Sequence, residues 1–130
     1  MNNLTNQGEL LVLDWLNGVG NPYRPRTPLL IALYLTLPDP ETGLGGVEVT
    51  GGGYRRMPCT MSPAANGSAQ NASDVNFPTA TSTWGTIVGG GIWDNEQLYL
   101  LWTGAFTTPR LVSTGEDFYI PSSSISLALN

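Results

Sequence analysis

The sequence predicts a mainly β protein, a single β-sandwich or jelly-roll-like domain of about eight strands with one short N-terminal helix. Apolar and polar residues alternate in short runs, most regularly at residues 124–129. Turn residues separate these runs roughly every 8–15 residues, as in sandwiches. The chain has 130 residues, the size of one domain. We divide it into a helix and connector (residues 1–28) and a sandwich (residues 29–130).

The helix is predicted just after the N-terminus, ahead of a proline-rich connector. Asn6 is the expected N-cap, with Glu9 three residues later completing a capping box. Leu11 and Trp15 lie one turn apart, so one broad side of the helix is apolar. Gly18 is the expected end. A helix of about a dozen residues is marginal alone, so this side must dock on the protein's own sheet or on a neighbouring subunit.

The predicted strands follow the connector. Residues 29–35 are apolar on both faces, as in a central strand. Gly51-Gly52-Gly53 turns the chain into a strand at residues 54–61, where Pro58 indicates an edge or a bulge. The glycine run at residues 89–91 indicates a bulge or a close backbone approach. Further strands are predicted at residues 74–78, 84–93, 97–106, 110–112, 117–120 and 124–129, and a polar loop at residues 62–73.

Composition excludes several classes of function. Charged residues make up 12% of the chain, the net charge is −5, and all five bases are arginine. This acidic balance disfavours nucleic acid and anionic membranes, and the longest apolar run is too short to span a bilayer. Histidine, the usual general base, is absent, and Cys59 alone forms neither a zinc site nor an internal disulfide. We expect a buried Cys59, no enzymatic activity and no cofactor.

The acidic and aromatic residues leave alternative functions open. Close pairs of acids usually form turns, although such pairs also bind calcium or hydrolyse glycosides. The four tryptophans are expected in core packing, with a sugar-stacking platform as the alternative. The acid pairs are Asp39 with Glu41, Asp94 with Glu96, and Glu116 with Asp117.

Three segments resemble a group of small virion proteins of tailed bacteriophages, described as tail-fibre-like or head-decoration proteins. They are EVTGGGYRR at residues 48–56, FPTATSTWGTI at residues 77–87 with its continuation to residue 94, and GAFTTPR at residues 104–110 with residues 115–121. With the N-terminal helix, the similarity covers nearly the whole chain. The resemblance implies a structural role in the virion, either in the head or in the tail.

The leading interpretation is a capsid cement or decoration protein that binds the major capsid protein as a homotrimer on the particle surface. The sequence shows no recognisable signal peptide, so synthesis in the host cytoplasm is expected. Low charge and many apolar strands suit large subunit interfaces. The expected subunit or capsid contacts are Leu11, Trp15, Arg24, Arg26 and Arg55.

Two alternatives remain. One is a tail-fibre or baseplate-associated module that contacts glycans on the host surface through exposed aromatic residues and polar loops. The other is a free β-sandwich that binds carbohydrate or calcium.

Overall fold

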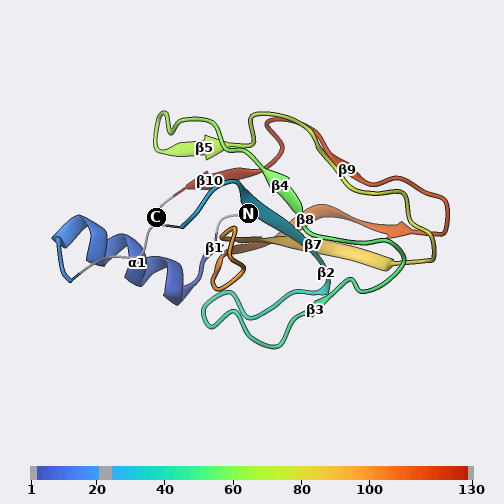
Figure 1. Ribbon diagram of the computed structural model, residues 1–130, viewed down its shortest axis with the longest axis horizontal. Helices are drawn as coiled ribbons and strands as arrows, with labels where there is room; N and C mark the ends of the chain where they lie inside the picture. Colours follow the sequence, from blue (N-terminus) through green and yellow to red (C-terminus); the bar gives the residue numbers. More distant parts are fainter. Residues whose placement is uncertain (1–2, 21–24, 129–130) are drawn as a thin grey trace.

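The structure is a computed structural model that describes residues 3–20 and 25–128. It is mainly β with one helix, which confirms the predicted fold class (Figure 1). The elements are β1 (Asn3–Leu4), α1 (Asn6–Asn17), β2 (Leu29–Thr36), β3 (Val47–Glu48), β4 (Met57–Cys59), β5 (Ser68–Gln70), β6 (Val75–Asn76), β7 (Gly85–Trp93), β8 (Leu100–Val112), β9 (Tyr119–Ile120) and β10 (Ser126–Ala128).

The strands form one large antiparallel sheet and two short ladders. The large sheet has the order β1-β8-β7-β2-β3, and β4 also pairs with β2. The ladders are β10-β5 and β6-β9. Figure 1 shows the ladder strands lying on one side of the large sheet. The second layer of the sandwich is therefore built from two short ladders and their loops, and is not a continuous sheet.

The core lies between these two layers. Ile31 and Leu33 of β2 are fully buried, as expected for a central strand, and pack with residues of the second layer such as Phe118. Aromatic rings extend the core, because Phe118 contacts both Phe77 and Phe106. Cys59 is buried as predicted, and burial raises the pKa of its thiol to about 11.

The glycine run of β7 produces both a bulge and a close backbone approach, as the sequence indicated. The register between β7 and β8 shifts between Ile87 and Gly89. A Cβ atom added at Gly89 would lie 3.0 Å from the Cα atom of Ala105 and closer still to the Gly104 carbonyl oxygen. Strands β7 and β8 therefore meet at this position only because Gly89 has no side chain.

Some predicted strand boundaries were wrong. The strands expected at residues 97–106 and 110–112 are one strand, β8, because β7 pairs with both parts of it. Pro109 lies in the bulge between those parts, where Val88 alone lies opposite residues 106–109. The predicted loop at residues 62–73 contains β5, whose polar side chains gave no alternating signal. The two-residue strands β1 and β3 were not predicted.

The helix begins one residue earlier than predicted. Its N-cap is Thr5, whose Oγ1 atom accepts a hydrogen bond from the Gly8 amide at 3.2 Å. The same hydroxyl donates to the Leu100 carbonyl oxygen at 2.6 Å, and Thr5 is only 1% exposed. The prediction of Asn6 as the N-cap was therefore wrong, because the Thr5 hydroxyl caps the helix and also hydrogen-bonds to β8. Gly18 ends the helix in the left-handed conformation, as predicted.

We expect Thr5→Ala to lower the free energy of unfolding by about 1–2 kcal/mol, because it removes both the cap and the tie to β8. Urea denaturation measures this loss. The matched control is Asn6→Ala, since Asn6 is exposed and bonds to Glu41 through its backbone amide. An equal loss from Asn6→Ala would contradict the assignment of the cap.

Candidate subunit-contact surface

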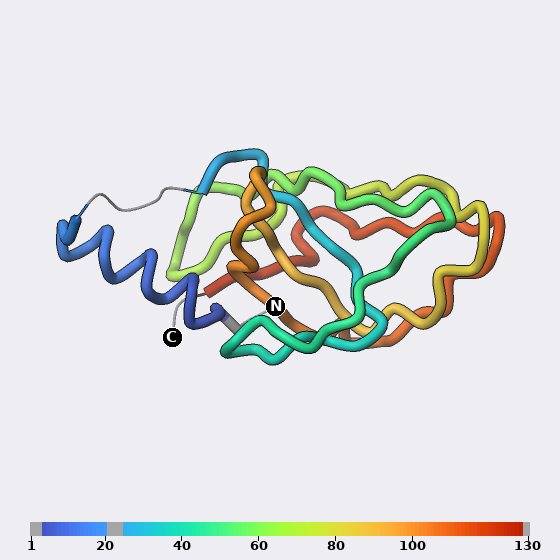
Figure 2. Tube along the Cα trace, turned by 60° about the horizontal axis from the view of Figure 1, so that its bottom comes forward, coloured from blue at the N-terminus to red at the C-terminus, as the bar shows by residue number. Residues whose placement is uncertain are grey.

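Helix α1 projects from the body of the molecule. Figures 1 and 2 both show it extending away from the sheets at one end of the longest axis. It packs against β8 and β1, and Gly8 is its only buried residue within the described part of the chain. A Cβ atom added at Gly8 would lie 2.9 Å from the Leu101 carbonyl oxygen, so glycine allows this close contact. The rest of the helix stands clear of the sheet.

The projecting helix exposes large apolar side chains. Trp15 is 67% exposed, and four other apolar residues of the helix or its end are more than half exposed. An exposed group of large apolar side chains of this kind usually marks an interaction site. The four other residues are Leu10, Leu13, Leu16 and Val19.

A groove separates the helix from the large sheet. Its volume is about 590 Å³, and Leu11, Val12 and Trp15 line its helix side. Leu29, Leu101 and Trp102 line its sheet side. The structure thus brings Leu11 and Trp15, two of the predicted contact residues, to one apolar groove. We call α1 and this groove the α1 surface.

The predicted arginine contacts do not all reach the α1 surface. Arg26 lies at its rim, since its neighbours Pro25 and Thr27 line the groove. Its side chain is 74% exposed, and its Nε atom lies 3.1 Å from the Glu96 carboxylate. Arg24 lies outside the described residues. Arg55 is exposed, and the residues that line the groove do not include it.

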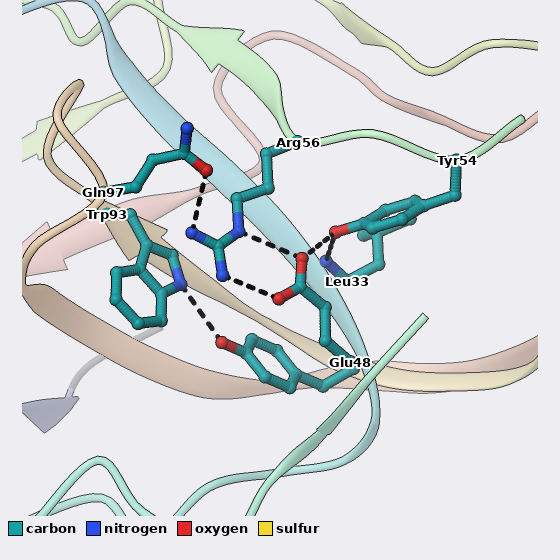
Figure 3. Close-up of polar contacts among 7 residues, drawn as sticks. Leu33, Glu48, Tyr54, Arg56, Trp93 and Gln97 are labelled. Atoms are coloured by element: carbon teal, nitrogen blue, oxygen red, sulfur yellow. Dashed lines mark hydrogen bonds and ion pairs between the residues drawn. The ribbon is translucent and has the colours of Figure 1, made fainter. Parts of the chain in front are cut away.

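A polar cluster on β2 involves Arg56, which the sequence analysis did not single out. Arg56 donates to both carboxylate oxygens of Glu48, from Nε at 3.0 Å and from Nη2 at 2.7 Å (Figure 3). Its guanidinium also lies 4.1 Å from the centre of the Trp93 ring. Burial alone would lower the pKa of Arg56, but the hydrogen bonds and charge of Glu48 outweigh burial and raise it. We call Glu48, Tyr54, Arg56 and Trp93 the Glu48–Arg56 cluster.

Tyr54 closes a gap in the large sheet. The backbone of β2 pairs with β4 at residues 29–31 and with β3 from Tyr34 onward, so Leu33 lies between the two partners. The Tyr54 hydroxyl accepts from the Leu33 amide at 3.0 Å and donates to Glu48 at 2.7 Å. Burial, and then the bond to Glu48, raises the pKa of Tyr54. The hydroxyl replaces a missing strand partner, so the cluster holds β2, β3 and β4 together.

The acid pairs form turns in this structure. Asp39 accepts from the amides of Glu41 and Thr42, and these bonds lower its pKa. Buried Asp94 accepts in the same way from the amides of Leu98 and Tyr99. Among the residues that the structure describes, no group of three or more acids or cysteines is placed to hold a metal ion.

The tryptophans divide between the core and the surface. Trp84 is buried and donates to the Gly52 carbonyl oxygen at 2.8 Å, which fits the expected core role.

A second cleft of about 340 Å³ lies between β8 and β9, where Arg110 packs over Phe118. It combines aromatic and polar groups. In the described ranges, no helix is long and apolar enough to cross a membrane.

Comparison with known proteins gave one family match. The model of a family described as "Podophage GP4 fiber I protein gp80" matches residues 3–128, which is nearly the whole chain. No curated protein matches the chain.

Proposed function

Because the chain belongs to the podophage GP4 fiber I protein gp80 family, we propose that it is a fibre component of a phage tail, held in the particle through the α1 surface. Membership of this family makes the chain a structural protein of a tailed-phage virion. Its partners are therefore other proteins of the virion. The finer assignment to the tail is our proposal.

The observation that carries the proposed attachment is the exposed apolar helix. A free subunit that exposes Leu10, Leu13 and Trp15 on a projecting helix leaves apolar area in contact with water. Burying such area stabilises an interface by about 25 cal/mol per Å² before the costs of association. Assembly into a particle would cover these side chains and the groove beside them.

The family description favours the tail-fibre interpretation over capsid decoration. The leading expectation from the sequence was a cement protein on the major capsid protein, and the family match gives no specific support for it. We therefore place the proposed function in the tail.

We further propose that the protein acts by holding partners and not by catalysis. The chain has no histidine and no lysine, so the commonest groups for proton transfer and nucleophile activation are missing. The charged pair of Glu48 and Arg56 uses its hydrogen bonds to join strands. Asp39 and Asp94 satisfy turn amides.

Imaging of the intact phage tests the proposed location. Gold-labelled antibodies against the purified chain are expected to mark the tail or its fibres in electron micrographs. Particles that lack the chain serve as the control for labelling. Label confined to the capsid shell would overturn the tail assignment and restore the decoration interpretation.

A further inference from the structure

We propose that the occupant of the α1 surface is a second copy of this chain. The inference rests on the proposed function, because it names the partner of the same surface.

Helix α1 carries apolar side chains on two faces, one that lines its own groove and a second where two leucines lie beside Asn6 and Asn17. Gly8, Leu11 and Trp15 follow the spacing of a single helical face and line the groove. Leu10 and Leu13 lie one turn apart on the opposite side, and both are more than half exposed. The two leucines of the second face are therefore open to a partner from outside the chain.

Acidic residues border this second face on both sides. Glu9 lies one turn from Leu13, and Asp14 lies one turn from Leu10. Neither acid forms an ion pair with any residue that the structure describes. The last turn of α1 contains no base that would offset the negative end of the helix dipole. A partner that fits this face has apolar side chains flanked by positive charge.

A second copy supplies that chemistry at the rim of its groove. Arg26 contacts Glu96 through its Nε atom at 3.1 Å, and a guanidinium has five N–H donors, so the same side chain can bind a second carboxylate. Arg26 stands beside the apolar residues of the groove and is mostly exposed. Leu10 and Leu13 of one copy would pack along the α1 surface of the next, with Asp14 beside Arg26 of the next copy.

The shape of the molecule permits this exchange. Because α1 extends beyond the sheets at one end, it can reach a neighbour while both sandwich bodies stay apart (Figure 2). If every copy gives one helix and receives one, the contact forms a closed ring when the rotation between neighbours closes, and an open filament when it does not. The homotrimer expected from the sequence is one such ring.

Light scattering coupled to size-exclusion chromatography tests the inference on the full isolated chain. The chain is expected to run as an oligomer whose mass falls on dilution. Leu13→Glu is expected to weaken association about 30-fold or more, because it places a charge in the apolar contact. The matched control is Leu111→Glu, which changes a leucine of the same exposure at the far end of β8, beside Thr86 of β7, and should leave the mass unchanged.

Exchanging the charges of Asp14 and Arg26 tests whether these two residues pair between copies. Asp14→Arg alone and Arg26→Asp alone are each expected to weaken association about five-fold, as for surface ion pairs. The double variant is expected to recover most of the loss, because the pair is restored with its signs reversed. A double variant no better than the single variants would overturn the pairing.

A chain that stays monomeric at all concentrations would overturn the second copy as the occupant. The proposed tail location would survive that result, since a different virion protein would then cover α1. Conversely, gold label on the capsid shell would end the tail assignment without affecting the measured mass. The two experiments therefore fail independently.

Discussion

Replacing Gly89 with alanine is expected to lower the free energy of unfolding by about 3 kcal/mol or more. The added Cβ atom would meet the Gly104 carbonyl oxygen and the Ala105 Cα atom, and it would lie 2.7 Å from the Leu37 side chain. Backbone atoms cannot rotate away as a side chain does, so β7 and β8 would have to separate in the middle of the large sheet. Thermal and urea denaturation measure the loss, and failure to fold is its extreme form.

Thr86→Ala is the matched control for Gly89→Ala. Thr86 is an exposed residue of the same strand, so its replacement changes only strand propensity, by less than about 1 kcal/mol. A Gly89→Ala protein as stable as the Thr86→Ala protein would show that the two strands do not meet as closely as described.

Replacing Tyr54 with phenylalanine is expected to destabilise the protein by about 1–3 kcal/mol. The ring contacts with Phe77 and Trp84 remain, but the Leu33 amide loses its acceptor and Glu48 loses a donor. Leu33 is fully buried, so water cannot easily replace the hydroxyl. Urea denaturation measures the difference.

The control for Tyr54→Phe is Tyr119→Phe, since Tyr119 is more than half exposed. Removing a hydroxyl there should change stability by less than about 0.5 kcal/mol. Equal effects of the two substitutions would mean that the Tyr54 hydroxyl does not take the place of a strand partner.

Much of the fold could be predicted from local sequence patterns. Residues 29–35 are apolar on both faces because β2 lies inside the large sheet, between β7 and the pair β3 and β4. Pro58 indicated an edge, and among the described strands β4 pairs only with β2. Gly51, Gly52 and Gly53 all have positive φ angles, as the expected turn requires. In each case the residue types within a few positions carry the signal.

The features that sequence reasoning missed depend on partners far away in the chain. Thr5 caps α1 because its hydroxyl also reaches the Leu100 carbonyl oxygen, which no local pattern shows. Strand β5 is polar and is defined by its pairing with β10. The bulge that keeps β8 extended through Pro109 depends on β7.

The candidate site was predicted in part. Leu11 and Trp15 share one groove because helical spacing places them on one face, and this spacing is visible in the sequence. Arg55 and Arg56 are adjacent and chemically identical, so only the position of Glu48 and Trp93 shows which of them joins the cluster. The exposure of Leu10 and Leu13 could not be predicted from the sequence. It depends on the direction in which α1 projects from the large sheet.

Incorporation into the particle tests most directly whether the α1 surface holds the protein in the virion. Phage is produced with the double variant Leu10→Glu and Leu13→Glu, or with the control Leu111→Glu, and quantitative mass spectrometry compares this chain with the major capsid protein. We expect purified particles to lack most of the double variant, although it remains folded and soluble in the host, and to contain the control at the wild-type level. Wild-type incorporation of the double variant would contradict the assignment of α1 as the contact surface.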